Sequence, residues 1–428
     1  MIWIKNGRLV DPKSQTDQFC DICIERDRIA GIMPAGSAEE KREAEDTVID
    51  ASGMVVAPGM IDVHVHFREP GFTYKEDIDT GAAAAAAGGY TTVICMANTK
   101  PIVDNEETMM YLRERAQNQP IHVLNTAAIT KGFGGKELTD MIGLKGLGAV
   151  GFTDDGVPIA DTSVVMEAMK MAKALDVPLS FHEEDPALIG SFGVNQGLVS
   201  MAVGVEGAPA VAEDVLVARD CALALSTGAE IDIQHISSAT SVNIVRAFKA
   251  LGKNIHAEAT PQHFALTEAA VLEKGTLARV NPPLRTEADR LAIIEGLKDN
   301  TIDYIATDHA PHSKEEKEKD MKSAPSGMIG LETALALGLT HLVAPGHLGL
   351  SHFLEKLTVN PAELYHLDAG YVAVGGIADL VIFDAKETWT VTENFKSKAS
   401  NSPFIGDTLT GKVKYTICSG KIVYSDGE

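Results

Sequence analysis

The chain has 428 residues and a formal net charge of −23, with 45% hydrophobic and 23% charged residues. This balance is typical of a globular protein with a large core, and the acidic surface argues against nucleic acids and anionic membranes as partners because both need basic surface. It does not exclude small anionic substrates, since a few local cations or a metal can override the global charge. The length allows an alternating strand–helix barrel, which uses about 250 residues as one unit, and a smaller domain beside it.

Five cysteines are scattered along the chain without a disulfide framework, which favours a reducing compartment and free thiols: Cys20, Cys23, Cys95, Cys221 and Cys418. Cys20 and Cys23 form a C-x-x-C in a strand-like stretch, and because no second pair completes a zinc site, a structural role is expected. No signal-peptide pattern is evident at the start, and no apolar run approaches the about 18 residues that span a bilayer. We therefore expect a cytoplasmic protein without a membrane partner.

Residues 1–54 contain short alternating stretches and no long helix, which is typical of a small β-domain. From residue 55 the pattern becomes a repeat of apolar strand, polar or glycine-containing loop and helix. The candidate strands lie at 55–66, 90–99, 121–129, 148–155, 177–184, 230–237, 254–263 and 303–312. The candidate helices lie at 104–117, 161–175, 211–226, 241–251, 287–298 and 331–343, and the alanine-rich stretch from Gly81 to Gly89 predicts a tightly packed helix.

Eight strand–helix units predict an α/β fold with a (β/α)8 barrel of the TIM type over residues 55–365. Residues 371–428 return to short alternating stretches. We therefore expect a small β-sandwich domain formed by both termini, residues 1–54 and 366–428, beside the barrel. The charged run KEEKEKD at 314–320 is expected to be a solvated loop or helix face without chemistry.

Residue types that bind metals stand at the ends of several candidate strands. They are His64 and His66 on the first, Asp154 and Asp155 on the fourth, His182 on the fifth, His235 on the sixth and Asp308 on the eighth. His64 and His66 are two residues apart and so share one face of their strand. The carboxyl-terminal ends of barrel strands converge where active sites lie. Imidazole and carboxylate donors gathered there suit zinc, with an open coordination position for water.

Each of these residues has a simpler interpretation on its own. An H-x-H pair can arise by chance, and a lone strand histidine such as His182 or His235 is more often a hydrogen-bonded core residue. Chance does not readily place all of them at strand ends in barrel order. The joint pattern therefore indicates a metal site.

Longer motifs resemble a known family. HVHFREPG (64–71) resembles the first-strand signature of cyclic amidohydrolases, and its REPG continuation is similar to that of dihydroorotases. Further segments resemble that family in order and spacing: MANT (96–99), GFTDDG (151–156), FHEE (181–184), QHIS (234–237), VNPPLR (280–285), ATDHAPH (306–312) and P-x-G-x-x-G-L-E-T (325–333). The match covers essentially the whole chain, and it resembles the long-chain bacterial class I type of dihydroorotase.

The resemblance implies two zinc ions per chain. The more buried ion would be held by His64, His66 and Asp308, and the other by His182 and His235. Many superfamily members bridge the two ions with a carboxylated lysine at the end of the fourth strand, but GFTDDG contains no lysine.

An aspartate bridge is therefore what the resemblance suggests. Asp155 is preferred over Asp154 because its spacing to His182 better matches that of the family. Neighbours in a strand point in opposite directions, so only one of the two aspartates should face the metals.

The resemblance also implies a substrate pocket, whose residues are His66, Arg68, Asn98, Asn281, His312, Ser326 and Gly327. Arg68 follows His66 by two residues and is suited to a bidentate grip on the substrate carboxylate, with Asn98 and His312 beside it. Asn281 and the backbone near Ser326 and Gly327 would contact the ring. The simpler alternatives are a surface position for Arg68 and turn or cap duties for the two asparagines.

The implied reaction is the reversible cyclisation of N-carbamoyl-L-aspartate to (S)-dihydroorotate with loss of water, a step of de novo pyrimidine (UMP) biosynthesis. In the hydrolytic direction a zinc-activated hydroxide would attack the ring amide carbonyl. Asp308 would accept the hydroxide proton and deliver it to the leaving ring nitrogen.

Two positions depart from the family pattern without removing a ligand. Ser326 stands where relatives commonly have phenylalanine, and Gln262 stands where they commonly have a second histidine beside His263. Six other histidines have no role in this scheme and are expected in the core or on the surface: His122, His256, His341, His347, His352 and His366.

Three other functions compete with this one. An allantoinase or hydantoinase would usually carry the bridging lysine. A catalytically inactive scaffold for aspartate transcarbamoylase, or a plain binding barrel, would leave the complete ligand set unexplained. A homodimer is expected, as is common in such families, and aspartate transcarbamoylase is a candidate partner because some long-chain relatives require it.

Overall fold

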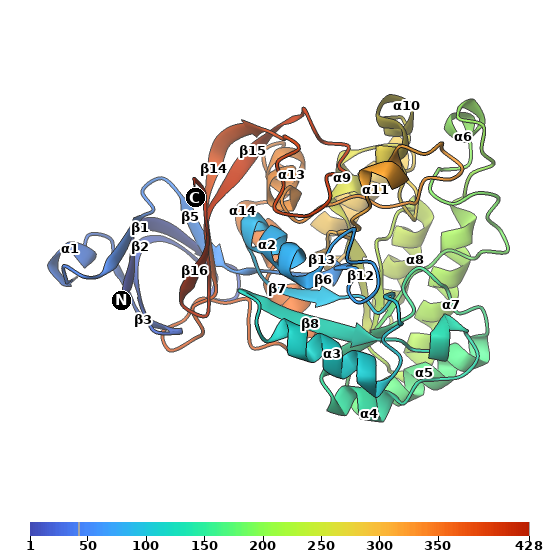
Figure 1. The fold of residues 1–428 in the computed structure, drawn as a ribbon, viewed down its shortest axis with the longest axis horizontal. Coiled ribbons are helices and arrows are strands. Elements are labelled where there is room, and N and C mark those ends of the chain that lie inside the picture. The colour runs from blue at the N-terminus through green and yellow to red at the C-terminus, as the bar shows by residue number, and fades with distance from the viewer. Residues whose placement is uncertain (42, 428) are drawn as a thin grey trace.

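The computed structural model describes residues 1–41 and 43–427. A sheet built from both ends of the chain lies at one end of the molecule, and a ring of strands and helices forms the rest (Figure 1). This arrangement confirms the predicted barrel and the predicted small β-domain of the two termini.

The barrel consists of eight parallel strands in the order β13-β12-β11-β10-β9-β8-β7-β6. Their bounds are β6 Met60–Val65, β7 Tyr90–Cys95, β8 His122–Ala127, β9 Ala149–Thr153, β10 Leu179–Phe181, β11 Ile231–Ile233, β12 Ile255–Ala259 and β13 Tyr304–Ile305. A bridge between Val65 and His309 links β6 to the segment that follows β13, and the amide of His66 donates to the carbonyl of His309 at 2.9 Å. All eight predicted strands are present, and the ring is nearly closed.

The predicted first strand is divided in two at Gly59. β5 (Val55–Pro58) pairs with β1 and β14 of the terminal sheet, whereas β6 begins the barrel. A Cβ at Gly59 would lie 2.2 Å from Thr91 Oγ1, so only glycine allows the chain to pass this close to β7. The hydrogen bonding of the terminal sheet therefore continues past the predicted boundary between residues 54 and 55.

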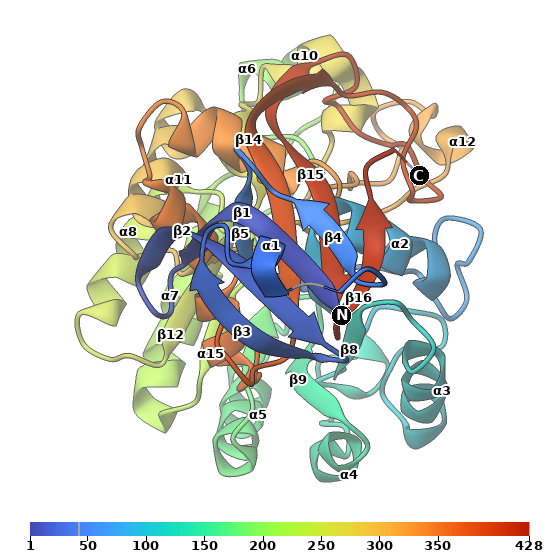
Figure 2. The same ribbon diagram turned by 90° about the vertical axis from the view of Figure 1, so that its left-hand side faces the viewer.

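Helices surround the barrel strands, as seen beyond the terminal sheet in Figure 2. Their bounds are α2 Ile78–Gly88, α3 Glu106–Ala116, α4 Met141–Gly146, α5 Thr162–Leu175, α6 Leu198–Ala202, α7 Val211–Thr227, α8 Ala239–Lys249, α9 Pro261–Ala265, α10 Ala270–Lys274, α11 Glu287–Lys298, α12 Lys314–Lys317, α13 Ala334–Gly338, α14 Leu350–Glu355 and α15 Val359–Leu364. The predicted helix 331–343 differs: α13 starts at Ala334 and continues as a wider π-helical turn over Leu339–Val343. The other predicted helices are confirmed.

The alanine-rich helix α2 is tightly packed, as the sequence predicts. A Cβ at Gly81 would lie 2.4 Å from the ring of Phe67, and one at Gly88 would lie 2.2 Å from the carbonyl oxygen of Leu331. Small side chains let this helix approach its neighbours closely. The helix thereby supports the loop that follows β6, where several predicted site residues stand.

The terminal sheet has the order β16-β15-β14-β5-β1-β2-β3, with β4 paired to β1. The bounds of its remaining elements are β1 Ile2–Asp11, β2 Thr16–Glu25, β3 Arg28–Pro34, α1 Ala38–Lys41, β4 Thr47–Asp50, β14 Leu380–Thr390, β15 Thr408–Cys418 and β16 Lys421–Ser425. β14 and β15 arch from this sheet towards α13 of the barrel (Figure 1). Cys20 and Cys23 lie on β2, and their side chains pack in two separate buried hydrophobic clusters.

Within the described part of the chain, no helix has the length and apolar character needed to cross a membrane.

Candidate metal centre and active site

The carboxyl-terminal ends of the barrel strands enclose a cavity of about 170 Å³. Its lining residues are His66, Arg68, Asn98, Asp155, Gly156, His182, His235, Asn281, Asp308, Ala310, His312, Ser326 and Gly327. Every site residue predicted from the sequence is among them except His64, which lies fully buried beside His66 and His235. The fold therefore brings the whole predicted set together.

His64 and His66 share two carboxylates at the bottom of this cavity. His64 Nε2 lies 3.5 Å from Asp155 Oδ1 and 3.6 Å from Asp308 Oδ1. His66 Nε2 lies 2.9 Å from Asp308 Oδ1 and 3.5 Å from Asp155 Oδ2. The Nε2 atom of His64 is buried and has no hydrogen-bond partner among the described residues. A buried, unpaired nitrogen aimed between two carboxylates is suited to a cation.

His182 and His235 converge on the other side of Asp155. His182 Nδ1 lies 3.0 Å from His235 Nε2, and the two nitrogens lie 3.7 and 3.9 Å from Asp155 Oδ1. Two ring nitrogens that face one carboxylate oxygen can both bind a cation placed between them, whereas a hydrogen bond between the two rings requires one nitrogen to carry a proton.

The donor atoms are close enough to coordinate ions. One atom from each of His64, His66 and Asp308 lies within 4.8 Å of the others, and the same holds for His64, Asp155 and His235. Imidazole nitrogens and carboxylate oxygens at this spacing fit a metal of the zinc type.

Asp155 and Asp154 point in opposite directions, as expected for neighbours at a strand end. Asp154 Oδ1 accepts the amides of Ile129 and Thr130 at 2.8 and 3.0 Å, and its other oxygen accepts the Thr130 hydroxyl. Asp154 therefore holds the loop after β8, and Asp155 alone of the pair faces the four histidines.

Three buried carboxylates that were not predicted from the sequence support the candidate ligands. Glu258 accepts from His64 Nδ1 at 2.5 Å, and Glu184 accepts from His182 Nε2 at 2.9 Å. Asp62 accepts the amides of His64 and Thr307. Such partners fix the tautomer and orientation of a ligating imidazole. A signal was present, because Glu258 stands on the seventh strand and Glu184 two residues after His182 in FHEE.

The electrostatics of the cluster favour positive charge. Burial opposes ionisation of Asp155, but the histidines, His64 foremost, outweigh it and lower the pKa of Asp155 well below its usual range. Burial likewise opposes the charge on His64, but Glu258 and Asp155 raise its pKa. Burial, followed by His182 and His64, lowers the pKa of His235. Asp155 is thus a negative group on the cavity floor that a metal ion could neutralise.

Three residues of the site have left-handed backbone conformations. Arg68, His235 and Asp308 have φ angles of 61°, 35° and 47°, which non-glycine residues rarely adopt. Conformations of this kind concentrate at functional sites, where the surrounding structure holds them.

A positive corner lies opposite the metal-type residues. Arg68 Nε donates to the carbonyl of Pro311 at 3.2 Å, which leaves other guanidinium donors free to face the cavity. His312 Nε2 donates to the carbonyl of Ser326 at 2.9 Å, and Lys75 Nζ donates to His312 Nδ1 at 3.3 Å. Burial, then Arg68 and Lys75, lowers the pKa of His312 far below its usual value, so His312 is neutral and Arg68 is the charged group.

The two predicted asparagines differ in how they are engaged. Asn98 Oδ1 accepts from His66 Nδ1 at 2.9 Å and its Nδ2 donates to Asp155 Oδ2 at 3.0 Å, so this side chain holds two candidate ligands in place. Asn281 Oδ1 is buried and has no partner among the described residues. Of the two amides, Asn281 is therefore the one that has an atom free for a ligand.

The loop of Ser326 and Gly327 is held from both sides. The amide of Gly327 donates to the carbonyl of Arg279 at 2.9 Å. Asn401, from the segment between β14 and β15, donates to the carbonyls of Ala310 and Gly327, each at 3.1 Å. Gly327 has a φ angle of 129°, and a Cβ there would lie 2.8 Å from that of Ala310. The loop conformation therefore requires glycine.

The charged run at 314–320 is not entirely solvated, which corrects the sequence-based expectation. Lys317 is 5% exposed, and its ammonium donates to the carbonyls of Pro325 and Gly327 at 2.9 and 3.0 Å. Burial, then Arg279, lowers the pKa of Lys317 to about 7. Lys317 turns inward because the backbone carbonyls of the loop at 325–327 need hydrogen-bond donors.

The six histidines without a predicted role all lie outside the strand-end cavity. His256 bonds to Glu230 at 2.8 Å, His352 bonds to Asn300 at 2.9 Å, and the others are half-buried or exposed. His263 is buried and bonds to Thr260 and to the carbonyl of Pro282.

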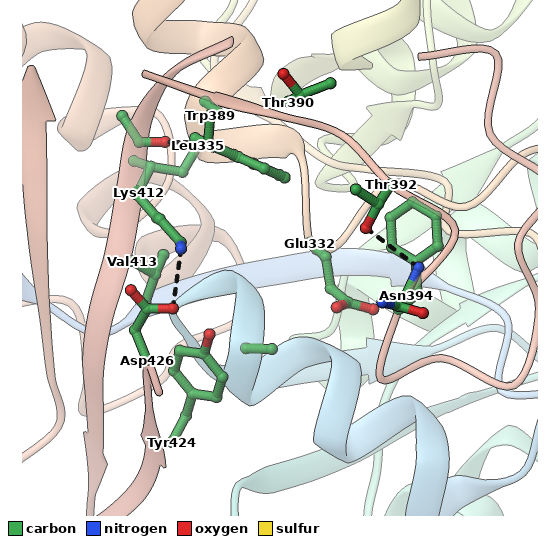
Figure 3. Close-up of a pocket in the computed structure, with 14 residues that line it drawn as sticks. Glu332, Leu335, Trp389, Thr390, Thr392, Asn394, Lys412, Val413, Tyr424 and Asp426 are labelled. Carbon is green, nitrogen blue, oxygen red and sulfur yellow. Dashed lines mark hydrogen bonds and ion pairs between the residues drawn. The ribbon is translucent and has the colours of Figure 1, made fainter. Parts of the chain in front are cut away.

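A second cavity, of about 350 Å³, is lined by residues of α2 and α13 of the barrel and of β14, β15 and β16 (Figure 3). Trp389 and Tyr424 line it, and Lys412 and Asp426 form an ion pair of 3.0 Å on its wall. Burial raises the pKa of Glu332 to about 7 in this cavity. No histidine or cysteine lines it, and its chemistry is unlike that of the strand-end cavity.

A barrel with these donors at its strand ends defines the cyclic amidohydrolase class, and solved structures share its fold. L-hydantoinase (dihydropyrimidinase) from Arthrobacter aurescens superposes with a TM-score of 0.88 at 25% identity, over 100% of this chain and 96% of that chain. D-hydantoinase (dihydropyrimidinase) from Thermus sp. superposes with a TM-score of 0.87 at 24% identity, over 100% of this chain and 96% of that chain.

Sequence comparison narrows the class. Residues 53–241 match the family described as dihydro-orotase-like. The chain is 61% identical over 425 residues to a dihydroorotase of Clostridioides difficile (strain 630), covering 99% of this chain and 100% of the relative. It is 56% identical over 427 residues to a dihydroorotase of Clostridium acetobutylicum, covering 100% of both. The chain belongs to the dihydroorotase family.

Proposed function

We propose that the protein is a metal-dependent dihydroorotase, which interconverts N-carbamoyl-L-aspartate and (S)-dihydroorotate in de novo pyrimidine (UMP) biosynthesis. The observation that carries the proposal is the convergence of the family's motif residues on one cavity of about 170 Å³. The family membership, with full-length relatives that are themselves dihydroorotases, supports the same substrate.

The residues at the strand ends would hold two zinc ions. His64, His66 and Asp308 would bind the more buried ion, His182 and His235 would bind the other, and Asp155 would bridge them. When bound, the ions would supply a hydroxide nucleophile near neutral pH and polarise the scissile carbonyl. The carboxylates of Glu258 and Glu184 would keep the ring nitrogens oriented towards the ions.

Asp308 is the proposed general acid and base. Its carboxylate reaches the cavity, and Oδ1 lies 2.9 Å from His66 Nε2, which holds it in place. In hydrolysis Asp308 would take the proton from the nucleophile and pass it to the ring nitrogen that leaves; in cyclisation the same proton would travel in reverse.

The positive corner would bind the substrate carboxylate. Arg68 offers a planar fork that can hold a carboxylate by two hydrogen bonds. His312, which is neutral and lies 3.5 Å from the guanidinium, would complete this corner, and Asn281 would contact the ring. The backbone at Ser326 and Gly327 would line the other side of the ring.

A cytoplasmic homodimer, with aspartate transcarbamoylase as a candidate partner, is also proposed from the family resemblance. Several apolar side chains near α6 are exposed, with Leu198 at 83% and Met201 at 75%, and such groups favour contact with another protein. Analytical ultracentrifugation of the purified chain, alone and mixed with the transcarbamoylase, tests both associations.

The deciding experiment is a spectrophotometric assay of dihydroorotate hydrolysis by zinc-supplemented protein, with hydantoin and dihydrouracil as competing substrates. We expect turnover of dihydroorotate alone, and loss of turnover in Asp308→Asn by a factor on the order of 100 to 10,000. The matched control Asp299→Asn changes a surface aspartate that bonds to Arg246 and should leave the rate unaffected. Preferred turnover of a substrate without a carboxylate, or full activity of Asp308→Asn, would contradict the proposal.

A further inference from the structure

Metal-type side chains gather at one further place in the described part of the chain, far from the strand-end cavity. The group consists of His122, Asp379 and Cys418, and one donor atom of each lies within 4.8 Å of the other two. His122 begins β8 of the barrel, Asp379 precedes β14 and Cys418 ends β15. The three residues are thus distant in sequence and meet where the barrel contacts the terminal sheet.

Strand pairing explains why the aspartate and the cysteine meet. β14 and β15 are antiparallel with Leu380 opposite Ile417, so Asp379 and Cys418 are the next pair along the ladder. Opposite residues of such a pair have Cβ atoms about 5 Å apart. The amide of Ser419 donates to Asp379 Oδ1 at 2.7 Å and fixes the carboxylate in place.

The histidine approaches this pair from the barrel. His122 Nε2 lies 3.0 Å from Asp379 Oδ2. The thiol of Cys418 is buried, and it donates a long hydrogen bond of 3.7 Å to the carbonyl of Thr91. Its sulfur also lies within 4.8 Å of donor atoms of the imidazole and the carboxylate, so the three side chains are directed at the same small space.

The group is open to solvent on one side. His122 and Cys418 line a cavity of about 960 Å³, and the His122 side chain is 38% exposed. An ion can enter from this side, and water can complete its coordination. Three cations on the same cavity wall, Arg113, Lys145 and Lys421, are exposed, so solvent and salt screen their repulsion of an ion.

We propose that His122, Asp379 and Cys418 form a second metal site, which binds one divalent ion of the zinc type between the barrel and the terminal sheet. Thiolate, imidazole and carboxylate are the three protein donors that zinc uses, whereas magnesium and calcium take oxygen donors and avoid sulfur. Three protein ligands and one water make four-coordinate zinc.

The local charge agrees with this geometry. The Asp379 carboxylate lies 3.0 Å from His122 Nε2, so a negative group stands beside the imidazole and the thiol and would attract a cation. Binding would release the thiol proton to solvent, and no redox change is involved. The site would join three chain segments and so stabilise the folded protein.

Cobalt provides a direct test, because a thiolate ligand gives Co²⁺ a charge-transfer band in the near ultraviolet that nitrogen and oxygen ligands do not. The strand-end cavity contains no cysteine among its lining residues, so ions bound there contribute no such band. We expect metal-depleted protein titrated with Co²⁺ to develop the band, with saturation at one ion per chain for this site. The readout is independent of dihydroorotate turnover, so it separates this proposal from the proposed function.

Three variants make the test specific. Cys418→Ser and His122→Asn should each weaken Co²⁺ and Zn²⁺ binding at this site by more than the about 10- to 100-fold typical of losing an outer partner. The control Cys221→Ala changes a buried cysteine of α7 and should keep the band. If Cys418→Ser folds poorly by circular dichroism, the half-exposed His122 still provides a variant. Absence of the band at saturating Co²⁺, or its persistence in Cys418→Ser, would overturn the proposal.

Discussion

The two groups of metal-type side chains lie at opposite ends of the barrel strands and differ in what surrounds them. At the carboxyl ends, beside a cavity of about 170 Å³, His64 and His182 form hydrogen bonds to the buried carboxylates of Glu258 and Glu184. At the amino end of β8, His122 is 38% exposed and has one carboxylate partner. The carboxyl ends of barrel strands position chemistry, whereas the amino ends contribute to stability. The difference suggests a rule. Candidate ligands held by further buried carboxylates indicate a reactive site, whereas a group without such partners, between the barrel and the terminal sheet, is suited to a structural site.

The largest expected effect is the loss of the proposed bridge. Asp155→Asn should reduce dihydroorotate turnover to background and lower the bound metal, because Asp155 is the carboxylate that approaches all four histidines. Activity and metal content by mass spectrometry measure this. Asp154→Asn is the matched control: it should keep its metals and lose thermal stability, since Asp154 holds the loop at Ile129 and Thr130. The reverse outcome would make Asp154 the bridge.

The substitution Glu258→Gln tests how much the buried carboxylates behind the histidines contribute. The glutamine can still accept from His64 Nδ1 but removes the negative charge, so zinc affinity or turnover should fall about 10- to 100-fold. Competition with a chromophoric chelator measures the affinity. Glu230→Gln, at the carboxylate that pairs with His256 outside the cavity, should change neither quantity. If Glu258→Gln and Glu230→Gln changed zinc affinity and turnover equally, the special role of the carboxylates at the carboxyl ends of the strands would be contradicted.

Asn401 comes from the terminal region of the chain but forms hydrogen bonds at the mouth of the candidate site. Its amide accepts from the backbone of His312 and donates to Ala310 and Gly327. Asn401→Ala should raise the KM for dihydroorotate on the order of tenfold, as expected for lost hydrogen bonds of about 1 kcal/mol each, with a smaller change in kcat. Asn394→Ala, on an exposed part of the same segment, should leave KM unchanged. A fall in kcat at constant KM would contradict a positioning role.

The junction cluster predicts a stability effect without loss of activity. Asp379→Asn should lower the free energy of unfolding by about 1 to 3 kcal/mol in the presence of chelator, because a buried charged acceptor of His122 and Ser419 is lost. Denaturant titration measures this change, and kcat/KM of the zinc-loaded enzyme should stay within about twofold of wild type. A large fall in kcat/KM would contradict this prediction, because it would mean that Asp379 affects the distant strand-end cavity.

The last prediction concerns the pH dependence of stability at Lys317. Its folded pKa of about 7 lies below the ordinary value of 10.5, because burial and Arg279 disfavour the charged form. Above 10.5 the lysine is neutral in both states. As pH falls towards 7 the unfolded chain binds a proton that the folded protein does not, so stability decreases by at most about 1.4 kcal/mol per pH unit. Lys317→Met should lack this slope in denaturant titrations across the same range, and parallel slopes would contradict it.

The barrel could be predicted because its pattern is local. Each strand–helix unit shows its own period, so all eight strands were found from the sequence. The break at Gly59 was missed because its cause is Thr91 on the next strand, 2.2 Å from where a Cβ would stand. The shortened helix at Ala334 was missed because its apolar residues continue past the point where the helix geometry changes.

The residues that line the candidate site were predictable from the sequence, whereas the carboxylates that hydrogen-bond behind them were not. Histidines at strand ends are distinctive, whereas a carboxylate such as Glu258 or Asp62 looks the same in sequence whether it supports a ligand or faces solvent. Lys317 was misplaced for the same reason, since a charged run does not reveal which of its members turns inward.

The sequence by itself determined the class of fold, the family and the set of donor residues, because these depend on residue type and on spacing within short segments. The tertiary structure decided that Asp155 rather than Asp154 faces the histidines, that Asn98 is occupied by His66 and Asp155, and that His122 meets Cys418. Those outcomes depend on distances between residues far apart in the chain. Such distances exist only after the barrel has closed and the terminal sheet has packed against it.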